Sequence, residues 1–261
     1  MGQKTIQSLE RGLDILFLFT EKKPALTIEE IASLSGLPKS TCYRVLKTFK
    51  KKNLIELNGD PGKYKLGVRL LKIESVIHKS IKVAAISMHY LQELSTISGE
   101  TAELVILNKD EAVCIEKVDS AETLRVMPDK GAVMGLHSGA SGKVIMAYLS
   151  EEQQNKIIEE KGLKKFTAYT IIDPILLKRH LQKIRKVGYA TSDQEFSPGV
   201  RALAAPIFNL NNKIIASICV VGPRERLTSR KISLLIDDVL EASREITKRL
   251  GGETKQQVKT N

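Results

Sequence analysis

The chain contains 261 residues, of which 42% are hydrophobic and 27% are charged, a composition typical of a well-cored globular protein with room for two domains. No stretch approaches the roughly twenty consecutive apolar residues that a membrane span requires. The apolar residues 12–19 are interrupted by Asp14, which is unlike the core of a signal peptide. We therefore expect a cytoplasmic protein that makes no membrane contact.

The net charge of +11 indicates an anionic partner, although charge alone does not separate nucleic acid from a membrane surface or an acidic ligand. Residues 1–72 contain 14 Lys or Arg and 7 Asp or Glu, so they carry +7 of this excess. The three cysteines are widely spaced and form no Cys-x-x-Cys motif, which argues against a disulfide framework or a zinc module. We expect three small buried side chains at Cys42, Cys114 and Cys219.

Two helices are predicted before residue 37. Ser8 is expected to cap the first, which would run to about Thr20 with one apolar side formed by Leu9, Leu13, Leu16 and Phe19. Thr27 and Glu30 have the three-residue spacing of a capping box, so the second helix should begin there and end at Gly36.

A third helix with two opposed faces is predicted over residues 38–49, because Pro38 suits the first turn of a helix. The apolar positions follow the 3.6-residue helical period: Cys42, Val45, Leu46 and Phe49. The other positions carry hydroxyl, aromatic and cationic groups that can bind phosphate and base edges: Lys39, Ser40, Thr41, Tyr43, Arg44 and Lys47. An isolated helix of this kind could equally be an ordinary amphipathic helix with a solvated basic face.

The next segment decides between these readings. Residues 54–57 and 63–66 are short strand candidates around a Gly-rich and Pro-rich tip, which predicts a hairpin. Three helices followed by a hairpin form a winged helix-turn-helix, which we expect over residues 1–67. The wing would carry Lys63 and Lys65 toward the DNA backbone.

The rest of the chain predicts an α+β domain with an antiparallel sheet. A linker helix is expected over residues 68–82, the second domain over 83–250, and a disordered tail over 251–261. Within the domain, helices are predicted at residues 83–99, 141–149, 151–160, 173–187 and 228–250. Strands are predicted at residues 103–108, 112–119, 123–127, 189–192, 202–210 and 213–221, the last two joined by a hairpin turn at Asn211-Asn212.

Several blocks, in order along the chain, resemble motifs of the IclR family of bacterial transcriptional regulators. They are residues 8–16 (SLERGLDIL), 64–67 (YKLG), 137–143 (HSGASGK), 188–195 (GYATSDQE), 199–206 (GVRALAAP) and 222–223 (GP). The resemblance implies a winged helix that dimerises on a palindromic operator and a GAF-like effector-binding domain that senses a small molecule, commonly a carboxylate or aromatic metabolite. It also implies a dimer or a tetramer, and repression more often than activation.

The family's ligand pocket maps onto six positions of this chain: Ala140, Ser141, Asp193, Ala202, Cys219 and Val221. The backbone N–H groups of the first two would suit an anion at a helix start. Some relatives carry hydroxyl or thiol groups where this chain has Ala202 and Val221, so its pocket is less polar and favours a larger or more apolar ligand. Asp193 and Glu195 could orient a ligand hydroxyl, or they could equally cap a turn or pair with Arg201.

Other functional classes find less support. Residues 139–143 miss the pattern of a P-loop and of a nucleophile elbow, so we expect no catalytic residues, no enzyme activity and no cofactor. A metal-binding sensor or enzyme using His137 with Cys114 or Cys219 is an alternative, although no metal-ligand spacing supports it. A constitutive architectural DNA-binding protein is the other alternative, and it would leave the large second domain unexplained.

Overall fold

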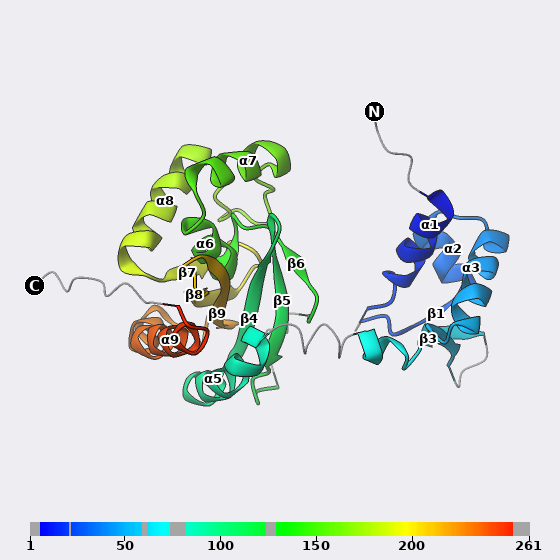
Figure 1. Ribbon diagram of the computed structural model, residues 1–261, viewed down its shortest axis with the longest axis horizontal. Helices are drawn as coiled ribbons and strands as arrows, with labels where there is room; N and C mark the ends of the chain where they lie inside the picture. Colours follow the sequence, from blue (N-terminus) through cyan, green and yellow to red (C-terminus); the bar gives the residue numbers. More distant parts are fainter. Residues whose placement is uncertain (1–5, 21, 59–61, 74–81, 124–128, 253–261) are drawn as a thin grey trace, which may run out of the picture. The chain divides into compact units, whose positions relative to one another are not determined.

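A computed structural model describes residues 6–20, 22–58, 62–73, 82–123 and 129–252 (Figure 1). The chain divides into two compact units, Met1–Ser80 and Ile81–Asn261, each with its own hydrophobic core. Among the described residues, no helix is long and apolar enough to cross a lipid bilayer.

The first unit is the expected winged helix-turn-helix. Its helices are α1 (Gln7–Leu16), α2 (Ile28–Ser35) and α3 (Lys39–Lys51). Strands β2 (Ile55–Leu57) and β3 (Lys63–Leu66) form the hairpin. A third strand that sequence reasoning missed, β1 (Ala25–Thr27), pairs with β3 on its other side. Three residues are too few for an alternating pattern to reveal a strand.

The prediction for α1 was wrong in two respects. The helix begins at Gln7 behind Ile6, with no side-chain cap from Ser8, and it ends at Leu16 rather than Thr20. Its buried face is also rotated: Gly12 and Ile15 face the core, while Leu9 and Leu13 are 57% and 42% exposed. A Cβ on Gly12 would lie 3.3 Å from the Phe49 ring, so the glycine allows α1 to approach α3 closely.

The turn into α2 follows the sequence prediction. The Thr27 N–H donates to Glu30 Oε2 at 2.8 Å, and the Glu30 N–H donates to Thr27 Oγ1 at 3.3 Å. This confirms the capping box. Gly36 then takes φ of 68°, a conformation that glycine adopts readily, and ends the helix.

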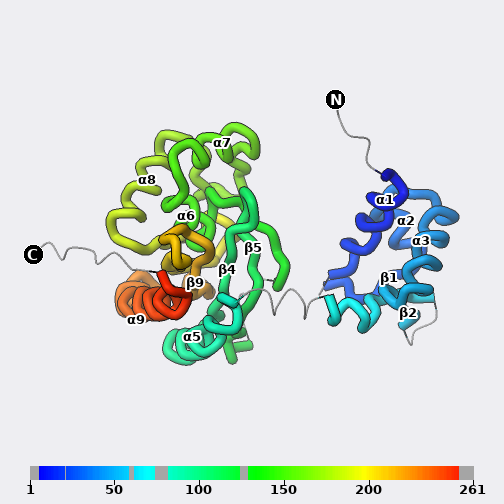
Figure 2. Tube along the Cα trace, in the orientation of Figure 1, coloured from blue at the N-terminus to red at the C-terminus, as the bar shows by residue number. Residues whose placement is uncertain are grey.

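The second unit contains a six-stranded antiparallel sheet in the order β6-β5-β4-β9-β8-β7 (Figures 1 and 2). The strands are β4 (Thr101–Asn108), β5 (Glu111–Val118), β6 (Val133–Met134), β7 (Ala190–Asp193), β8 (Val200–Phe208) and β9 (Ile214–Pro223). Helices α5 (Lys82–Ser98) and α9 (Ser229–Arg249) pack on one face of the sheet. Helix α6 (Gly139–Ala147) packs on the other face, with α7 (Glu151–Lys161) and α8 (Pro174–Val187) in the same core.

The predicted α+β class with an antiparallel sheet is therefore confirmed, and most helices and strands lie within a few residues of their predicted bounds. The two-residue strand β6 was missed. The helical start of the predicted linker is seen at residues 70–73. Residues 68 and 69 form a turn, and Lys82 already belongs to the first helix of the second unit. Residues 74–81 of the linker, most of the predicted strand at 123–127 and the tail from residue 253 lie outside the described residues.

Candidate functional site

The α3 helix separates its two faces as the sequence predicts. Cys42 and Leu46 are fully buried in the core of the first unit. Every residue proposed to contact DNA from this helix lies on the other side: Thr41 is half-buried, and Lys39, Ser40, Tyr43, Arg44 and Lys47 are exposed. The helix therefore presents one continuous surface of cationic, hydroxyl and phenolic groups.

Two of the predicted DNA-contacting lysines already have carboxylate partners. Lys39 Nζ lies 3.0 Å from Glu29 Oε1, and this hydrogen bond holds the pKa of Glu29 below its ordinary value. On the wing, Lys65 Nζ lies 3.7 Å from Glu56 Oε1. Both pairs are exposed to solvent, so a phosphate group could replace either carboxylate at small cost.

The wing is held close to the end of α3. The Gly67 N–H donates to the Leu54 carbonyl at 2.9 Å, and a Cβ at position 67 would lie only 2.4 Å from the Asn53 carbonyl oxygen. A larger residue could not occupy this position without moving the backbone. Lys63 and Lys65 are two residues apart on β3, so they share one face of the hairpin.

The second candidate site lies between α6 and the middle of the six-stranded sheet. Ala202 on β8 pairs with Val221 on β9, and Cys219 on β9 pairs with Glu103 on β4. Ala140 and Ser141 belong to the first turn of α6 above these strands, and Ser141 Oγ donates to Glu103 Oε1 at 2.9 Å. The structure thus gathers five of the predicted ligand residues, all at most 8% exposed: Ala140, Ser141, Ala202, Cys219 and Val221.

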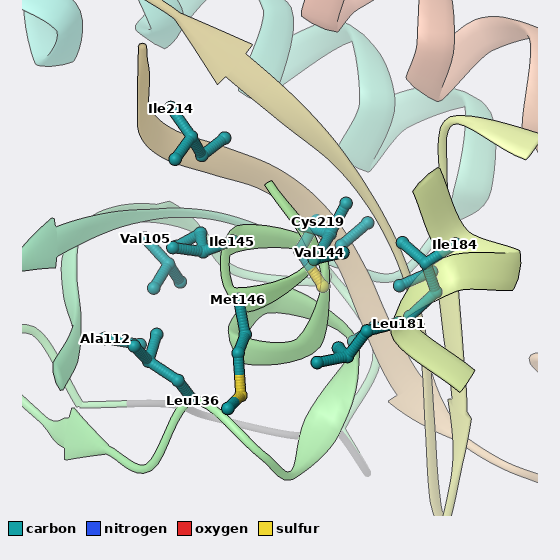
Figure 3. Packing of buried hydrophobic residues seen from close by; sticks show 14 of the residues in the cluster. Val105, Ala112, Leu136, Val144, Ile145, Met146, Leu181, Ile184, Ile214 and Cys219 are labelled. Atoms are coloured by element: carbon teal, nitrogen blue, oxygen red, sulfur yellow. The ribbon is translucent and has the colours of Figure 1, made fainter. Parts of the chain in front are cut away.

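Close packing positions α6 over this face. A Cβ on Gly142 would lie 2.7 Å from the Gly135 carbonyl oxygen, so α6 can rest on the preceding segment only because position 142 lacks a side chain. Figure 3 shows Val144, Ile145 and Met146 of α6 among strand residues of the same core, including Cys219. The helix is therefore packed closely against its neighbours from Gly142 onward.

One buried polar group at the start of α6 lacks a partner among the described residues. Ser138 is the N-cap residue, yet its side chain caps nothing, and among the described residues its buried Oγ has no hydrogen-bond partner. Buried polar groups without partners are uncommon in native proteins. Together with the first N–H groups of the helix, this hydroxyl provides donors suited to an anionic group.

A buried ion pair lies beside this helix start. Lys143 Nζ is fully buried and lies 2.5 Å from Glu195 Oε1, and it also donates to the Thr191 carbonyl at 2.9 Å. Burial lowers the pKa of Lys143 and raises that of Glu195, while their mutual attraction opposes both shifts. Glu195 also accepts the backbone N–H of Gly139, so this pair connects β7 and the loop after it to the start of α6.

His180 on α8 completes this cluster. Its Nε2 lies 3.3 Å from Lys143 Nζ, and burial lowers the pKa of His180 to about 4. The neutral ring can therefore accept a hydrogen bond from the lysine ammonium near pH 7. Sequence reasoning tested Lys143 only as a P-loop lysine and missed this role, because none of its partners is close to it along the chain.

Asp193 pairs with Arg201, which was one of the alternatives that the sequence left open. Its Oδ2 lies 2.5 Å from Arg201 Nη2, and its Oδ1 lies 3.2 Å from Arg224 Nε. Glu195 pairs with Lys143 rather than with Arg201. Both carboxylates therefore have structural partners in this conformation, and a role in binding a ligand remains a prediction for each.

Glu103 is a buried acidic residue of the site that sequence reasoning missed. It is 5% exposed and lies opposite Cys219, in the third residue pair of β4 and β9 counted from Thr101. Burial raises the pKa of Glu103, and the hydrogen bond from Ser141 opposes this shift. A charged residue inside the apolar stretch of residues 101–107 was the available signal.

The metal-binding alternative has no support in the described part of the chain, where no group of three His, Cys, Asp or Glu residues could hold a metal ion. His137 Nε2 lies 2.9 Å from the Lys164 carbonyl oxygen, and its ring stacks on Phe166. All three cysteines are buried and free, as predicted.

Comparison with known families agrees with both units. The model of the IclR helix-turn-helix domain matches residues 8–59, and that of the C-terminal domain of bacterial IclR transcriptional regulators matches residues 75–248. The chain belongs to the IclR family. Its curated relatives regulate transcription and are not enzymes.

Relatives and solved structures cover nearly the whole chain. The transcriptional repressor IclR of Escherichia coli K12 is 33% identical over 249 residues, covering 95% of this chain and 91% of that protein. The transcriptional regulator XynR of the same strain is 32% identical, covering 94% and 98%. The crystal structure of Thermotoga maritima IclR matches with a TM-score of 0.79 at 28% identity, covering 95% and 100%.

A further similar fold is that of an IclR homologue from Microbacterium hydrocarbonoxydans, crystallised in complex with 4-hydroxybenzoate. It matches with a TM-score of 0.81 at 22% identity, covering 93% of this chain and 98% of that one. The comparison shows a shared fold, and it shows that a protein with this fold holds a small aromatic carboxylate.

The Lys143–Glu195 pair provides the first testable prediction. Lys143→Met should lower the free energy of unfolding of the second unit by about 3–5 kcal/mol, because it leaves Glu195 buried without its cation. Adding Glu195→Gln to this variant should restore much of the loss. Urea unfolding of the full chain measures both effects, and the exposed pair variant Lys161→Met is a control that should change stability by less than about 1 kcal/mol. Equal costs for the single and double variants would contradict the assigned pairing.

Proposed function

We propose that this IclR-family protein is a ligand-responsive repressor that binds a palindromic operator as a dimer or a tetramer. The observation that carries this proposal is the exposed face of α3, where hydroxyl, phenolic and cationic groups lie opposite a fully apolar buried face. Because its proposed partner is chromosomal DNA, we expect the protein to act in the cytoplasm.

In this proposal, α3 enters the major groove of the operator. Ser40, Thr41, Tyr43, Arg44 and Lys47 would contact base edges and nearby phosphates. The remaining cations would hold the backbone from either side of the groove: Lys39 at the helix start, and Lys63 and Lys65 on the wing. Arg44 is the best candidate for base recognition, because its planar guanidinium can form two hydrogen bonds to guanine.

The second unit would bind the effector between α6 and the sheet. The N–H groups of Ala140 and Ser141 would accept its anionic end, and Ala202, Cys219 and Val221 would surround its apolar part. Asp193 and Glu195 would contact a hydroxyl group of the ligand. We infer a small carboxylate or aromatic metabolite, a class to which the 4-hydroxybenzoate of the homologous structure belongs.

Binding would act on DNA through the relative placement of two winged helices. A ligand changes such an equilibrium only when it binds one arrangement more tightly than the other. The buried pair between Lys143 and Glu195 supports this idea, because it connects the helix that holds the anion to the segment after β7. A shift of α6 on effector binding would therefore also shift β7 and the segment that follows it.

Self-association would use the outer face of α1. Four apolar side chains lie there with 42–74% of their surface exposed: Ile6, Leu9, Leu13 and Phe17. They recur every three or four residues, so they form one stripe along the helix. We propose that a second copy covers this stripe, because a two-fold pair of α1 helices would match the symmetry of a palindromic operator.

Arg44→Ala should weaken operator binding by about 1–3 kcal/mol and relax the preference at one base position in each half-site. Selection of sites from a random DNA library, followed by titration, measures both effects. Lys63→Ala should instead weaken all sequences alike and reduce the salt dependence by about one ion, because a phosphate contact carries no sequence information. Retention of the parent site preference by Arg44→Ala would remove Arg44 from base recognition.

Introducing Glu at both Leu9 and Phe17 should lower affinity for a palindromic site by at least about tenfold, because buried apolar anchors carry much of an interface's energy. Affinity for an isolated half-site should stay unchanged. Leu210→Glu, at a residue that is 71% exposed in the second unit, is the matched control. If the double variant keeps its preference for the palindrome over the half-site, the stripe on α1 is not the dimer contact.

Thermal-shift screening should identify carboxylates that stabilise the second unit, each tested with its neutral amide and repeated on operator DNA. A carboxylate present at one hundred times its Kd should add about 2.7 kcal/mol of stability. The amide should give a much smaller shift, because it lacks the charge that the start of α6 favours. Equal stabilisation by acid and amide would contradict an anionic effector.

A further inference from the structure

Glu103 lies among the residues of the proposed effector site. It lies on β4 beside Cys219 of β9 and accepts a hydrogen bond from Ser141, so two residues already assigned to the site flank its carboxyl group. The side chain is only 5% exposed. An effector anion held at the start of α6 would therefore lie close to the carboxyl group of Glu103. The family motifs did not indicate this neighbour.

The other carboxylates of the site are paired with cations, whereas Glu103 has no such pair among the residues that the structure describes. Asp193 pairs with Arg201, and Glu195 pairs with Lys143. Within the described ranges, no Lys or Arg nitrogen lies within ion-pair distance of Glu103. The nearest influence of this kind is the Lys117 ammonium on β5, which is itself 3.2 Å from Asp119.

The other described groups that face Glu103 are weak donors. They are the Ser141 hydroxyl on α6, the Cys219 thiol on β9 and the Cys114 thiol on β5, which stays protonated because burial raises its pKa. None of them can neutralise an ionised carboxylate. The carboxylate of Glu103 and that of an effector bound beside it in the same buried site cannot both remain ionised at low cost.

We propose that Glu103 is a specificity-determining residue that is protonated in the effector complex and donates its O–H to an oxygen of the effector's anionic group. The proton is taken up from water, and no covalent bond forms or breaks. This inference rests on the proposed effector site and adds a chemical requirement to it. The effector must carry an anionic group with a spare acceptor oxygen, and its binding must become weaker as pH rises.

The ligand-free protein supports the same assignment. Burial raises the pKa of Glu103, so its carboxyl group is more easily protonated in the folded chain than in the unfolded chain. The folded state therefore binds more protons than the unfolded state as pH rises above the ordinary range of a carboxyl group. The stability that Glu103 contributes is present below that range and is lost as pH rises through its folded pKa.

The test uses the full chain and two variants. Glu103→Gln keeps the shape and a hydrogen-bond donor but removes the titration. Glu111→Gln, on the neighbouring strand β5, removes a half-exposed carboxylate that pairs with Lys161 and serves as the control. Calorimetric titration with 4-hydroxybenzoate, and with 4-hydroxybenzamide as the neutral probe, is carried out between about pH 5.5 and 8.5.

For the parent chain and Glu111→Gln, the Kd of 4-hydroxybenzoate should rise by up to tenfold for each pH unit above the folded pKa of Glu103. For Glu103→Gln it should be independent of pH, and at high pH this variant should bind the acid more tightly than the parent chain. A pH-independent Kd for the parent chain would overturn the proposal.

Thermal unfolding without ligand tests the role of Glu103 separately from the proposed effector site. As pH rises over the same range, the parent chain should lose stability relative to Glu103→Gln, whereas Glu111→Gln should follow the parent. Parallel profiles for the parent and Glu103→Gln would overturn the role of Glu103, whatever the effector is. Diverging profiles together with no binding of 4-hydroxybenzoate at any pH would keep the protonated Glu103 and count against the proposed aromatic carboxylate.

Discussion

The buried contact between Lys143 and Glu195 determines where α6 lies in the second unit. A fully buried ammonium is tolerated only when its partners replace water, and here a carboxylate, a backbone carbonyl and a neutral imidazole do so. These partners come from β7, the loop that follows it, and α8. One side chain of α6 thus fixes the position of the helix against three other segments.

This arrangement would allow the start of α6 to serve as the proposed effector site inside the domain. Gly142 allows α6 to rest closely on the preceding backbone, and the ion pair prevents the helix from sliding along the sheet. The first N–H groups of α6 then keep a fixed position above Glu103 and Cys219. A fixed set of donors costs little reorganisation when an anion binds, which favours both affinity and selectivity.

The first unit has a small core, and the side chains proposed to contact DNA all lie on its surface. Seven buried apolar residues hold α1, α2, α3 and the wing together. The side chains proposed to contact DNA are exposed or half-buried, and the pairs Lys39–Glu29 and Lys65–Glu56 are exposed and weak. The surface of α3 can therefore change in sequence without loss of the fold, as expected of a recognition element.

The winged helix, the antiparallel α+β domain and the polar face of α3 were all predictable from the sequence. Each of these follows from local periodicity, capping and turn chemistry, which neighbouring residues specify. The family motifs also placed Ser141, Ala202 and Cys219 in one site. Only the tertiary structure decided which charges meet: Lys143 with Glu195, Asp193 with Arg201, and Glu103 with no cation in the described chain. It also decided that Leu9 and Leu13 face outward, since Gly12 packs against Phe49. These outcomes depend on residues far apart in sequence, because burial and pairing are set by the packing of elements and not by the pattern within any one of them.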